Sequence, residues 1–451
     1  VGRLMTERNS AGTVDIEQVD LFVLDESGPV QGISLHGQGM LVQTSITQSL
    51  FNEDIEASFV VSEGQGQLTN FNKKGLQGQE FVCVKVNKPQ LDDKLKTPEP
   101  TDIDLQFWCC EIEEIDFGRK GDTESFALRC VTKEKLLSLN NSVNQSYSNT
   151  YGNVANSIYD SHILKNPINK KYFKNYGTIA FSDTPFDVHE TNIINDFIVP
   201  GLQPFKAIDF CARRSFTPKS MANLFTFYQD FDGYHYHNIE TLVKDGIAAV
   251  EANPVPFTLI YDVSPDKIQS ENIYRKIFEI SELEGSDTML NLASGSFKNT
   301  VRTFDIIGQT YSDVNFDYKE KFSEYKHLGD ASLVDDFWMN SIASSNYEHL
   351  VFKDTSKQNQ YFEHILANRL PYLMALNNFK CTVTVDGDFF WKPGMVVKIV
   401  MPEQSAVQPV NLDEHKFAGY WLIEQVNHSF NSANVSTSLS LIKDSLLEVE
   451  K

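Results

Sequence analysis

The chain has 451 residues, enough for two or three hydrophobic cores, and its 61 acidic and 39 basic side chains give a formal net charge of −22 at pH 7. Affinity for phosphates comes mostly from clustered lysine and arginine, so this balance argues against a protein that reads nucleic-acid sequence. An acidic surface would suit a conduit through which DNA passes without sticking, although solubility alone explains the charge equally well.

Targeting and redox signals are few. No stretch approaches the roughly 18 apolar residues that a membrane-spanning helix needs, and no charged-then-apolar leader opens the chain. We therefore expect no membrane insertion, and assembly in a cytoplasm. The six cysteines include no C-x-x-C pair, so reduced, buried thiols are the expected state.

The first part of the chain, residues 15–137, is rich in strand patterns. In the last of them Phe126, Leu128 and Cys130 fall on one face, which is the two-residue period of a half-buried strand. A closed antiparallel barrel is the simplest arrangement for six strands of this length. The predicted strands are Val19–Leu24, Gly39–Ile46, Ile55–Val61, Glu80–Val86, Leu105–Ile115 and Ser125–Val131.

The middle of the chain changes character. Residues 139–175 are polar with little periodicity, and we expect a long surface loop with short helices. Helices are expected at Thr191–Ile198 and at Pro204–Arg214. In the second of these segments, apolar residues recur at helical spacing. Next, Leu224–Asp230, an Asp-Gly turn and Tyr234–His237 predict a hairpin, which we interpret as the start of a second barrel.

The hairpin and the residues that follow contain one pattern that resembles a metal site. His235, His237 and Glu240 have an H-x-H-x-x-E spacing, and alternate strand positions would place the two imidazoles side by side. Without a third patterned ligand, cross-strand polar residues are the preferred interpretation. No G-x-S-x-G, H-E-x-x-H or Walker pattern is present, so the sequence predicts no catalytic residue, no cofactor and no metal.

The last seventy-odd residues again have strand patterns with tight turns. In Phe379–Val385 the apolar residues alternate with lysine and threonine, and Asp386-Gly387 and Pro393-Gly394 are turn signals. Four antiparallel strands in a row predict a meander or half of a barrel. The other three strands are Met395–Met401, Tyr420–Val426 and the segment from Val435 to Leu441.

This order of strands and turns resembles the C-terminal barrel of the central hub protein in contractile phage baseplates, and the related half of type VI secretion spike proteins. Gln48–Val86 is similar to the family's first barrel, and Ile273–Tyr318 to its crossover between barrels, whereas residues 138–200 carry no motif of the family. The C-terminal residues that carry the resemblance are Gly387, Pro393-Gly394, Gly419-Tyr420, His428, Phe430 and Ile442-Lys443-Asp444-Ser445.

The resemblance implies a mainly β protein with α+β insertions. Two tail-tube-like antiparallel barrels would be interleaved in sequence, and three chains would form a pseudo-sixfold ring. Residues 15–137 would be the first barrel, and 138–262 a loop and helix region with the hairpin that opens the second barrel. Residues 263–340 would form a helix–strand crossover packed on the first barrel, and 341–445 the remainder of the second.

The function implied by the resemblance is structural. The chain would be a homotrimeric adaptor in the tail baseplate of a virion, matching a sixfold tail tube to a threefold spike and forming part of the DNA-ejection channel. Its partners would be the spike, the tube-initiator and tube proteins and the baseplate wedge proteins, with DNA passing without specific binding. Because the chain ends soon after its last predicted strand, a separate spike polypeptide is expected, which favours a phage hub over a secretion spike.

Two alternatives remain from the sequence. A β-rich receptor-binding or adhesion protein of the tail would also be acidic, aromatic and trimeric. A tail-associated hydrolase, the less favoured alternative, would need paired carboxylates in a cleft.

Overall fold

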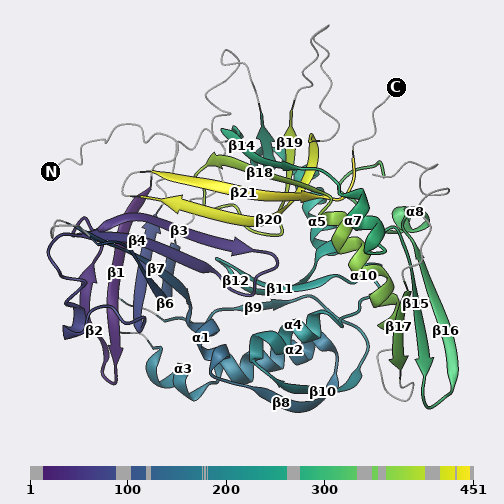
Figure 1. The fold of residues 1–451 in the computed structure, drawn as a ribbon, viewed down its shortest axis with the longest axis horizontal. Coiled ribbons are helices and arrows are strands. Elements are labelled where there is room, and N and C mark those ends of the chain that lie inside the picture. The colour runs from purple at the N-terminus through teal and green to yellow at the C-terminus, as the bar shows by residue number, and fades with distance from the viewer. Residues whose placement is uncertain are drawn as a thin grey trace, which may run out of the picture.

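The computed structural model describes residues 14–87, 103–117, 123–174, 176, 179, 181–261, 275–332, 348–353, 362–401, 417–431 and 434–446. These residues are mainly β, with helices inserted between the strands (Figure 1). The α-helices are α1 (Lys133–Leu139), α2 (Tyr151–Tyr159), α3 (Pro167–Tyr172), α4 (Pro204–Ala212), α5 (Ile239–Ala252), α6 (Pro254–Phe257), α7 (Thr288–Ala293), α8 (Tyr318–Lys321) and α10 (Phe362–Leu376). Within the described ranges, no helix has the length and apolarity that crossing a bilayer requires.

Thirteen of the described strands form one sheet, antiparallel except between β13 and β19. They are β1 (Asp15–Asp25), β2 (Gly28–Ser34), β3 (Leu41–Ser49), β4 (Glu56–Glu63), β5 (Glu80–Asn87), β6 (Ile103–Phe117), β7 (Glu124–Thr132), β13 (Thr258–Ile260), β14 (Glu279–Glu284), β18 (Phe379–Asp386), β19 (Val396–Val400), β20 (Gly419–Phe430) and β21 (Val435–Lys443). The pairing follows the path β14-β18-β21-β20-β3-β4-β7-β6-β5-β1-β2, with β19 beside β20 and β13 beside β19.

The N-terminal strands confirm the six strands predicted from alternation, and β2 adds a seventh. Their inward residues, such as Leu21, Phe59 and Leu128, are fully buried in one core. The expected closed barrel is not found among the described strands. The outer edge of β3 pairs with β20, from Thr44 opposite Phe430 to Ser49 opposite Gln425, so the two halves of the chain join into one continuous sheet.

The four C-terminal strands are also confirmed, but a simple meander is wrong. β18 pairs with β21 and β14, whereas β19 lies between β20 and β13. After β18 the chain crosses the end of the sheet at Gly387, where an added Cβ would lie 2.4 Å from the carbonyl oxygen of Val435. Glycine is therefore required by this close approach of two backbones. Strands from the middle of the chain, β13 and β14, complete this half of the sheet.

The region between β7 and α5 forms a separate layer below the large sheet in Figure 1. Residues 139–175 contain a strand as well as the expected short helices. The segment Thr191–Ile198 is not a helix, because its second half belongs to a strand. The ring of Phe197 in this strand packs against the ring of Tyr151, with 4.6 Å between the two centroids. The helix predicted at Pro204–Arg214 is confirmed as α4. The strands of this layer are β8 (Val143–Asn149), β9 (Phe186–Val188), β10 (Asn195–Leu202), β11 (Phe225–Asp230) and β12 (Gly233–Asn238).

The predicted hairpin is present as β11 and β12, but its expected place in a second barrel is wrong. β12 pairs in parallel with β9, and among the described strands none of the large sheet pairs with this three-stranded sheet. One face of it carries Phe225, Phe227, Tyr234 and Tyr236, which pack with α2 and α4 in a single aromatic core. Burial of these rings against the helices explains why the hairpin stays with the inserted layer.

The crossover segment does not pack on the N-terminal strands, contrary to expectation. Strands β15 (Lys298–Asp305), β16 (Thr310–Asp317) and β17 (Glu348–Lys353) form their own sheet at the opposite end of the molecule (Figure 1). Val301 and Phe316 share a core with α5, α10 and residues of β19, β20 and β21. The apolar side chains of β15 and β16 therefore pack against α10, beside the C-terminal half of the large sheet.

All six cysteines are free thiols, as expected, and five are buried. Cys110 is exposed, in contrast to the prediction. Burial raises the pKa of Cys83 to about 12, so this thiol stays protonated and unreactive at neutral pH.

Candidate functional site

The sheet of β9, β11 and β12 brings two of the three predicted metal-site residues together with one that the sequence pattern missed. His235 lies opposite Asp187 in the parallel β12–β9 pair, and His237 follows two residues later on the same face. One ligand atom from each of these three side chains lies within 4.8 Å of the other two. The third candidate ligand is therefore Asp187, which is 48 residues before His235 in the chain.

The imidazole of His235 is oriented by Asp230. Its Nε2 donates to the Oδ1 atom of Asp230 at 2.8 Å, and that oxygen also accepts from the backbone N–H groups of Asp232 and Gly233. Burial acts to raise the pKa of Asp230, but the hydrogen bond from His235 lowers it on balance. The ionised carboxylate fixes the proton on Nε2, and the other nitrogen, Nδ1, is buried without a hydrogen-bond partner.

His237 is held between two partners. Its Nε2 donates to the Oδ2 atom of Asp187 at 2.9 Å, and its Nδ1 accepts from the Tyr228 hydroxyl at 3.2 Å. The ring stacks on His189 with 3.9 Å between centroids. Burial, with the neighbouring His189 and His235, lowers the pKa of His237 to about 4, so the imidazole is neutral at neutral pH.

Glu240 does not join this group. Its Oε2 accepts from the Ser220 hydroxyl at 2.6 Å and from the N–H groups of Met221 and Ala222, and its Oε1 accepts from the N–H of Lys326. The carboxylate therefore ties two loops to the start of α5. The H-x-H-x-x-E spacing was wrong in its last member, because Glu240 belongs to a helix rather than to the strand that carries the histidines.

The closing run of the resemblance is a buried polar cluster. Lys443, Asp444 and Ser445 are each fully buried. The Nζ atom of Lys443 donates to the carbonyl oxygen of Ala418 at 2.7 Å and lies 5.5 Å from the ring centroid of Trp421. These residue types hold the end of β21 in place, which is a structural role.

His428, one of the residues that carry the resemblance, also has a structural setting. It is fully buried, and its Nδ1 is 3.0 Å from the Thr437 hydroxyl on the paired strand β21. The rings of Phe231 and Phe389 lie 5.4 and 5.1 Å from its own.

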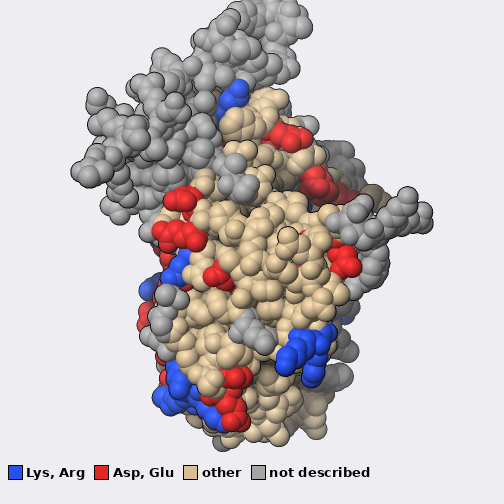
Figure 2. Space-filling view, turned by 90° about the vertical axis from the view of Figure 1, so that its left-hand side faces the viewer, with Lys and Arg blue, Asp and Glu red and all other residues tan. Residues whose placement is uncertain are grey.

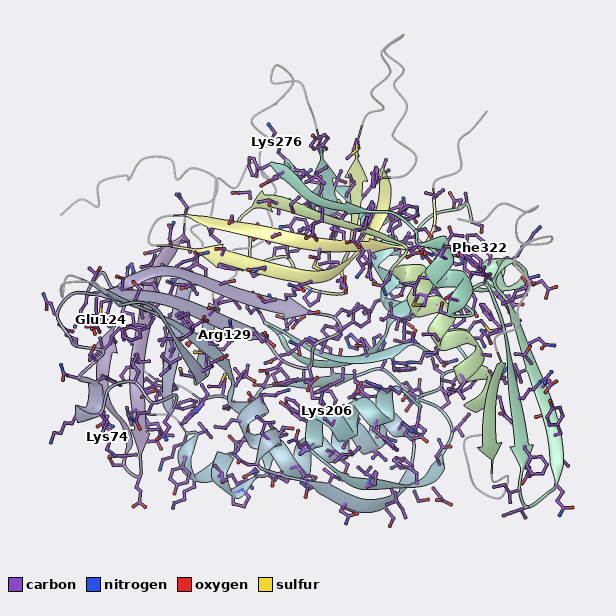
Figure 3. All side chains as sticks on the ribbon, viewed as in Figure 1. Lys74, Glu124, Arg129, Lys206, Lys276 and Phe322 are labelled. Atoms are coloured by element: carbon purple, nitrogen blue, oxygen red, sulfur yellow. The ribbon has the colours of Figure 1, made fainter. Side chains whose placement is uncertain are left out.

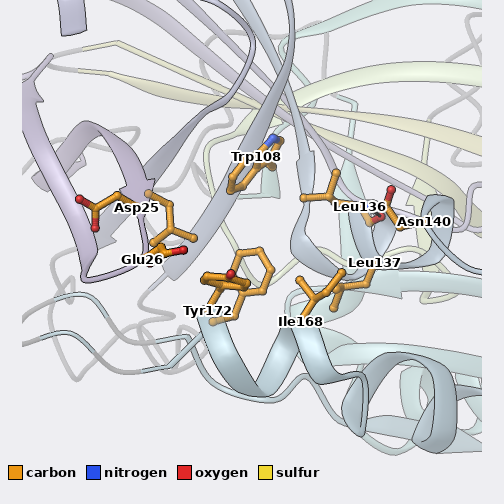
Figure 4. A pocket seen from close by; sticks show the side chains of 10 residues that line it. Asp25, Glu26, Trp108, Leu136, Leu137, Asn140, Ile168 and Tyr172 are labelled. Carbon is orange, nitrogen blue, oxygen red and sulfur yellow. Dashed lines mark hydrogen bonds between the residues drawn. The ribbon is translucent and has the colours of Figure 1, made fainter.

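A pocket of about 330 Å³ lies between the β1–β2 turn, β6, α1 and α3 (Figure 4). Its wall is mostly apolar, with Trp108 above Tyr172 and Ile168, and two carboxylates, Asp25 and Glu26, on one turn. Asp25 accepts from the Ser27 hydroxyl and backbone N–H, and these bonds lower the pKa of its carboxyl group. Hydrolysis of a glycoside requires two carboxyl groups on opposite sides of the bond and one with a raised pKa, and this pair does not match that arrangement.

Arg129 of β7, labelled in Figure 3, forms an exposed cluster of charges with two residues of β6. It pairs with Glu111 and Glu113, and about 59% of each side chain is exposed. The end of the molecule formed by β1 and β2 is different: in Figure 2, few charged side chains lie at the centre of this face.

Comparison with known proteins gives structural matches only, since no family model and no curated protein matches the chain. The tail protein from Neisseria meningitidis MC58 is 12% identical with a TM-score of 0.50, and the match covers 95% of this chain and 96% of that one. The 43 kDa tail protein of prophage MuSo2 from Shewanella oneidensis is 10% identical with a TM-score of 0.50, covering 96% and 98%. The chain therefore has the fold of these two tail proteins along nearly its whole length, which confirms the resemblance to phage tail proteins at the level of fold.

Proposed function

We propose that this chain is the central hub of a phage tail baseplate, a structural virion protein that joins a sixfold tail tube to a threefold spike as a homotrimer. The observation that carries the proposal is the fold, which two tail proteins share over nearly the whole chain. We assign it no enzymatic activity. In this proposal it is assembled in the host cytoplasm and contacts the spike, the tube-initiator and tube proteins and the wedge proteins of the baseplate.

The organisation of the large sheet supports a symmetry adaptor. Strands β1–β7 form one half, and β13, β14 and β18–β21 form the other, joined at the β3–β20 pair. We take these halves as the two tube-like units. Three chains would then supply six units, so a threefold ring could present a sixfold wall to the tube.

The two ends of the sheet support closure of the ring. Among the described strands, β2 pairs only with β1, and β14 pairs only with β18. Unpaired edge strands are templates for another chain, and pairing of β14 in one chain with β2 in the next would be a head-to-tail contact that closes after three copies. Phe278, directly before β14, is 53% exposed, and the face at the β1–β2 end carries few charges at its centre (Figure 2).

The charge of the chain is compatible with a DNA conduit. A net charge of −22 repels a polyanion, so DNA in the proposed channel would pass without binding. Release of the spike would open this channel.

The test is the mass of the purified chain in solution, alone and with the candidate spike from the same genome. A trimer is three times 51.2 kDa, about 154 kDa, and the spike should add as three further chains. If the isolated chain is a monomer, the spike should induce the trimer, because a ligand that binds only the ring stabilises it. A monomer that ignores the spike but binds cells or degrades their envelope would overturn the hub and favour adhesion or hydrolysis.

One pair of variants makes the test specific for the proposed contact. Phe278→Glu places a charge beside the edge of β14 and should shift the trimer toward monomer. Leu139→Glu makes the same kind of change at a side chain that is 50% exposed at the end of α1, away from either edge, and should leave the trimer intact. Equal behaviour of the two variants would contradict the β14–β2 contact.

A further inference from the structure

The face of the β9–β11–β12 sheet that points away from the aromatic core carries a cluster of metal-ligating side chains that the hub function does not use. Asp187, His235 and His237 lie on this face because parallel pairing sets Asp187 opposite His235. Tyr228 and Asp230 of β11 lie on the same face, at the positions that pair with His235 and with Gly233. The five side chains therefore lie on one face of this sheet, whose strands Figure 1 shows between the large sheet and the helices of the inserted layer.

The hydrogen bonds prepare the two imidazoles as ligands. A histidine that binds a metal usually donates its other ring N–H to a carboxylate or to another polar group, which fixes the tautomer and the ring orientation. His235 has this arrangement, since its Nε2–H is held by Asp230 while its Nδ1 lone pair is buried without a partner. An unpartnered buried nitrogen is costly unless something occupies it, and a cation is a suitable occupant.

His237 can supply the second nitrogen without gaining charge. If its Nε2 binds a metal, the proton moves to Nδ1, which then donates to the Tyr228 oxygen at the distance of 3.2 Å already present. The carboxylate of Asp187, now 2.9 Å from Nε2, becomes the third ligand.

The spacing is close to that of a metal site. Metal–nitrogen and metal–oxygen bonds of about 2.1 Å place the donor atoms of a tetrahedral site about 3.4 Å apart, against the 4.8 Å within which the three atoms lie here. The adjustment is at most about 1.4 Å, and rotation of the Asp187 side chain, which is 69% exposed, can supply part of it.

We propose that Asp187, His235 and His237 bind one divalent first-row transition metal, Zn²⁺ in the first instance, with water as a fourth ligand. Two imidazoles and one carboxylate are donors that suit this class of cation. The ion would fasten β9, a strand of three residues, to β12 and so stabilise the inserted layer.

The test uses the full-length chain after treatment with a chelator. Co²⁺ is titrated as a spectroscopic probe, and Zn²⁺ is then added as a competitor. We expect one Co²⁺ per chain with the intense visible absorption of a four-coordinate ion, displaced by one equivalent of Zn²⁺, and a higher unfolding temperature with either metal. Absence of saturable binding, or binding of several ions without this absorption, would overturn the proposal.

Matched variants locate the ion. Asp187→Asn and His235→Gln should abolish the absorption, and Asp230→Asn, which removes the orienting carboxylate, should weaken Co²⁺ binding by about 10- to 100-fold. Asp196→Asn, the same change on β10, the next strand along the chain, and Glu240→Gln should leave binding unchanged. Because Asp187 is exposed, its variant should fold even if a buried histidine variant does not. Full binding by Asp187→Asn, or loss of binding in Glu240→Gln with the fold intact by circular dichroism, would refute this ligand set.

Discussion

Removal of Asp444 should unfold the end of the large sheet at a measurable cost in stability. The Oδ2 atom of Asp444 is 2.6 Å from Nδ1 of His327, and its Oδ1 accepts from the Leu328 N–H at 3.0 Å and from the Ser445 hydroxyl at 2.7 Å. The other nitrogen of His327 lies 2.7 Å from the carbonyl oxygen of Phe322. Both ring nitrogens therefore face oxygen acceptors and donate to them, which makes the pair a buried ion pair.

The expected loss of unfolding free energy depends on which buried donors each substitution leaves without an acceptor. Asp444→Ala leaves the imidazolium and two further donors buried without partners, and breaking such a pair costs about 3 to 5 kcal/mol. Asp444→Asn should cost less, about 1 to 3 kcal/mol, because the amide oxygen can still accept from Leu328 and a neutral His327 can accept from the amide N–H. The order of stability is thus wild type, then Asp444→Asn, then Asp444→Ala.

The pH dependence has a defined sign. Burial acts to raise the pKa of Asp444, but the hydrogen bond and charge of His327 lower it on balance, below the usual 3.8. A carboxyl group with a lowered folded pKa stabilises the fold above its unfolded pKa and loses that contribution as pH falls. The contribution of Asp444 to the advantage of wild type over Asp444→Asn should therefore shrink as pH falls below about 4.

Guanidinium unfolding, followed by the fluorescence of tryptophan, measures these differences. Trp421 is fully buried beside Lys443 and reports on this region. The midpoints are compared at equal slopes, so that a change in midpoint reflects a change in stability. A loss below about 0.5 kcal/mol for Asp444→Ala, the range of an ordinary surface change, would refute the buried ion pair.

Two further predictions concern buried charges. Burial raises the pKa of Asp54 from 3.8 to about 7. Its stabilising contribution to the unfolding free energy is therefore complete below pH 3.8 and is lost as pH rises through 7. Over this range the stability of Asp54→Asn relative to wild type should increase by up to about 4 kcal/mol. Unfolding curves of both proteins between pH 4 and 8 check this, and a constant difference would contradict it. The guanidinium of Arg369 donates to the carbonyl oxygens of Ala212, Asn223 and Phe225, linking α10 to the inserted layer. Arg369→Gln should lower the unfolding free energy by about 3 kcal/mol, whereas the same change at the exposed Arg213 should have little effect.

Local structure was predictable wherever the chain alternates with a period of two. The strands β7, β18 and β21 were predicted from apolar side chains at alternate positions, and these side chains are buried in the structure. The period identifies the buried face but not the neighbouring strand. Pairing of β3 with β20 joins residues more than 370 positions apart, and this single pairing turns two expected barrels into one continuous sheet.

The candidate metal site shows the same limit. The alternate positions of His235 and His237 were visible in the sequence, whereas Asp187 enters only through the parallel register of β9 and β12. By its spacing, Glu240 looked like a third metal ligand, but it lies in helix α5, just after strand β12 has ended. Similarly, Thr191–Ile198 gave no sign of its partner β8, and the exposed Ile194 and Ile198 resembled one side of a helix.

The most direct test of the hub is a reconstruction of the assembled protein, with the spike present, by electron microscopy without imposed symmetry. We predict a closed ring of three chains, with six sheet units around a hollow axis and β14 of each chain beside β2 of the next. An open oligomer, a ring of another order, or three chains whose sheets do not surround a channel would contradict it.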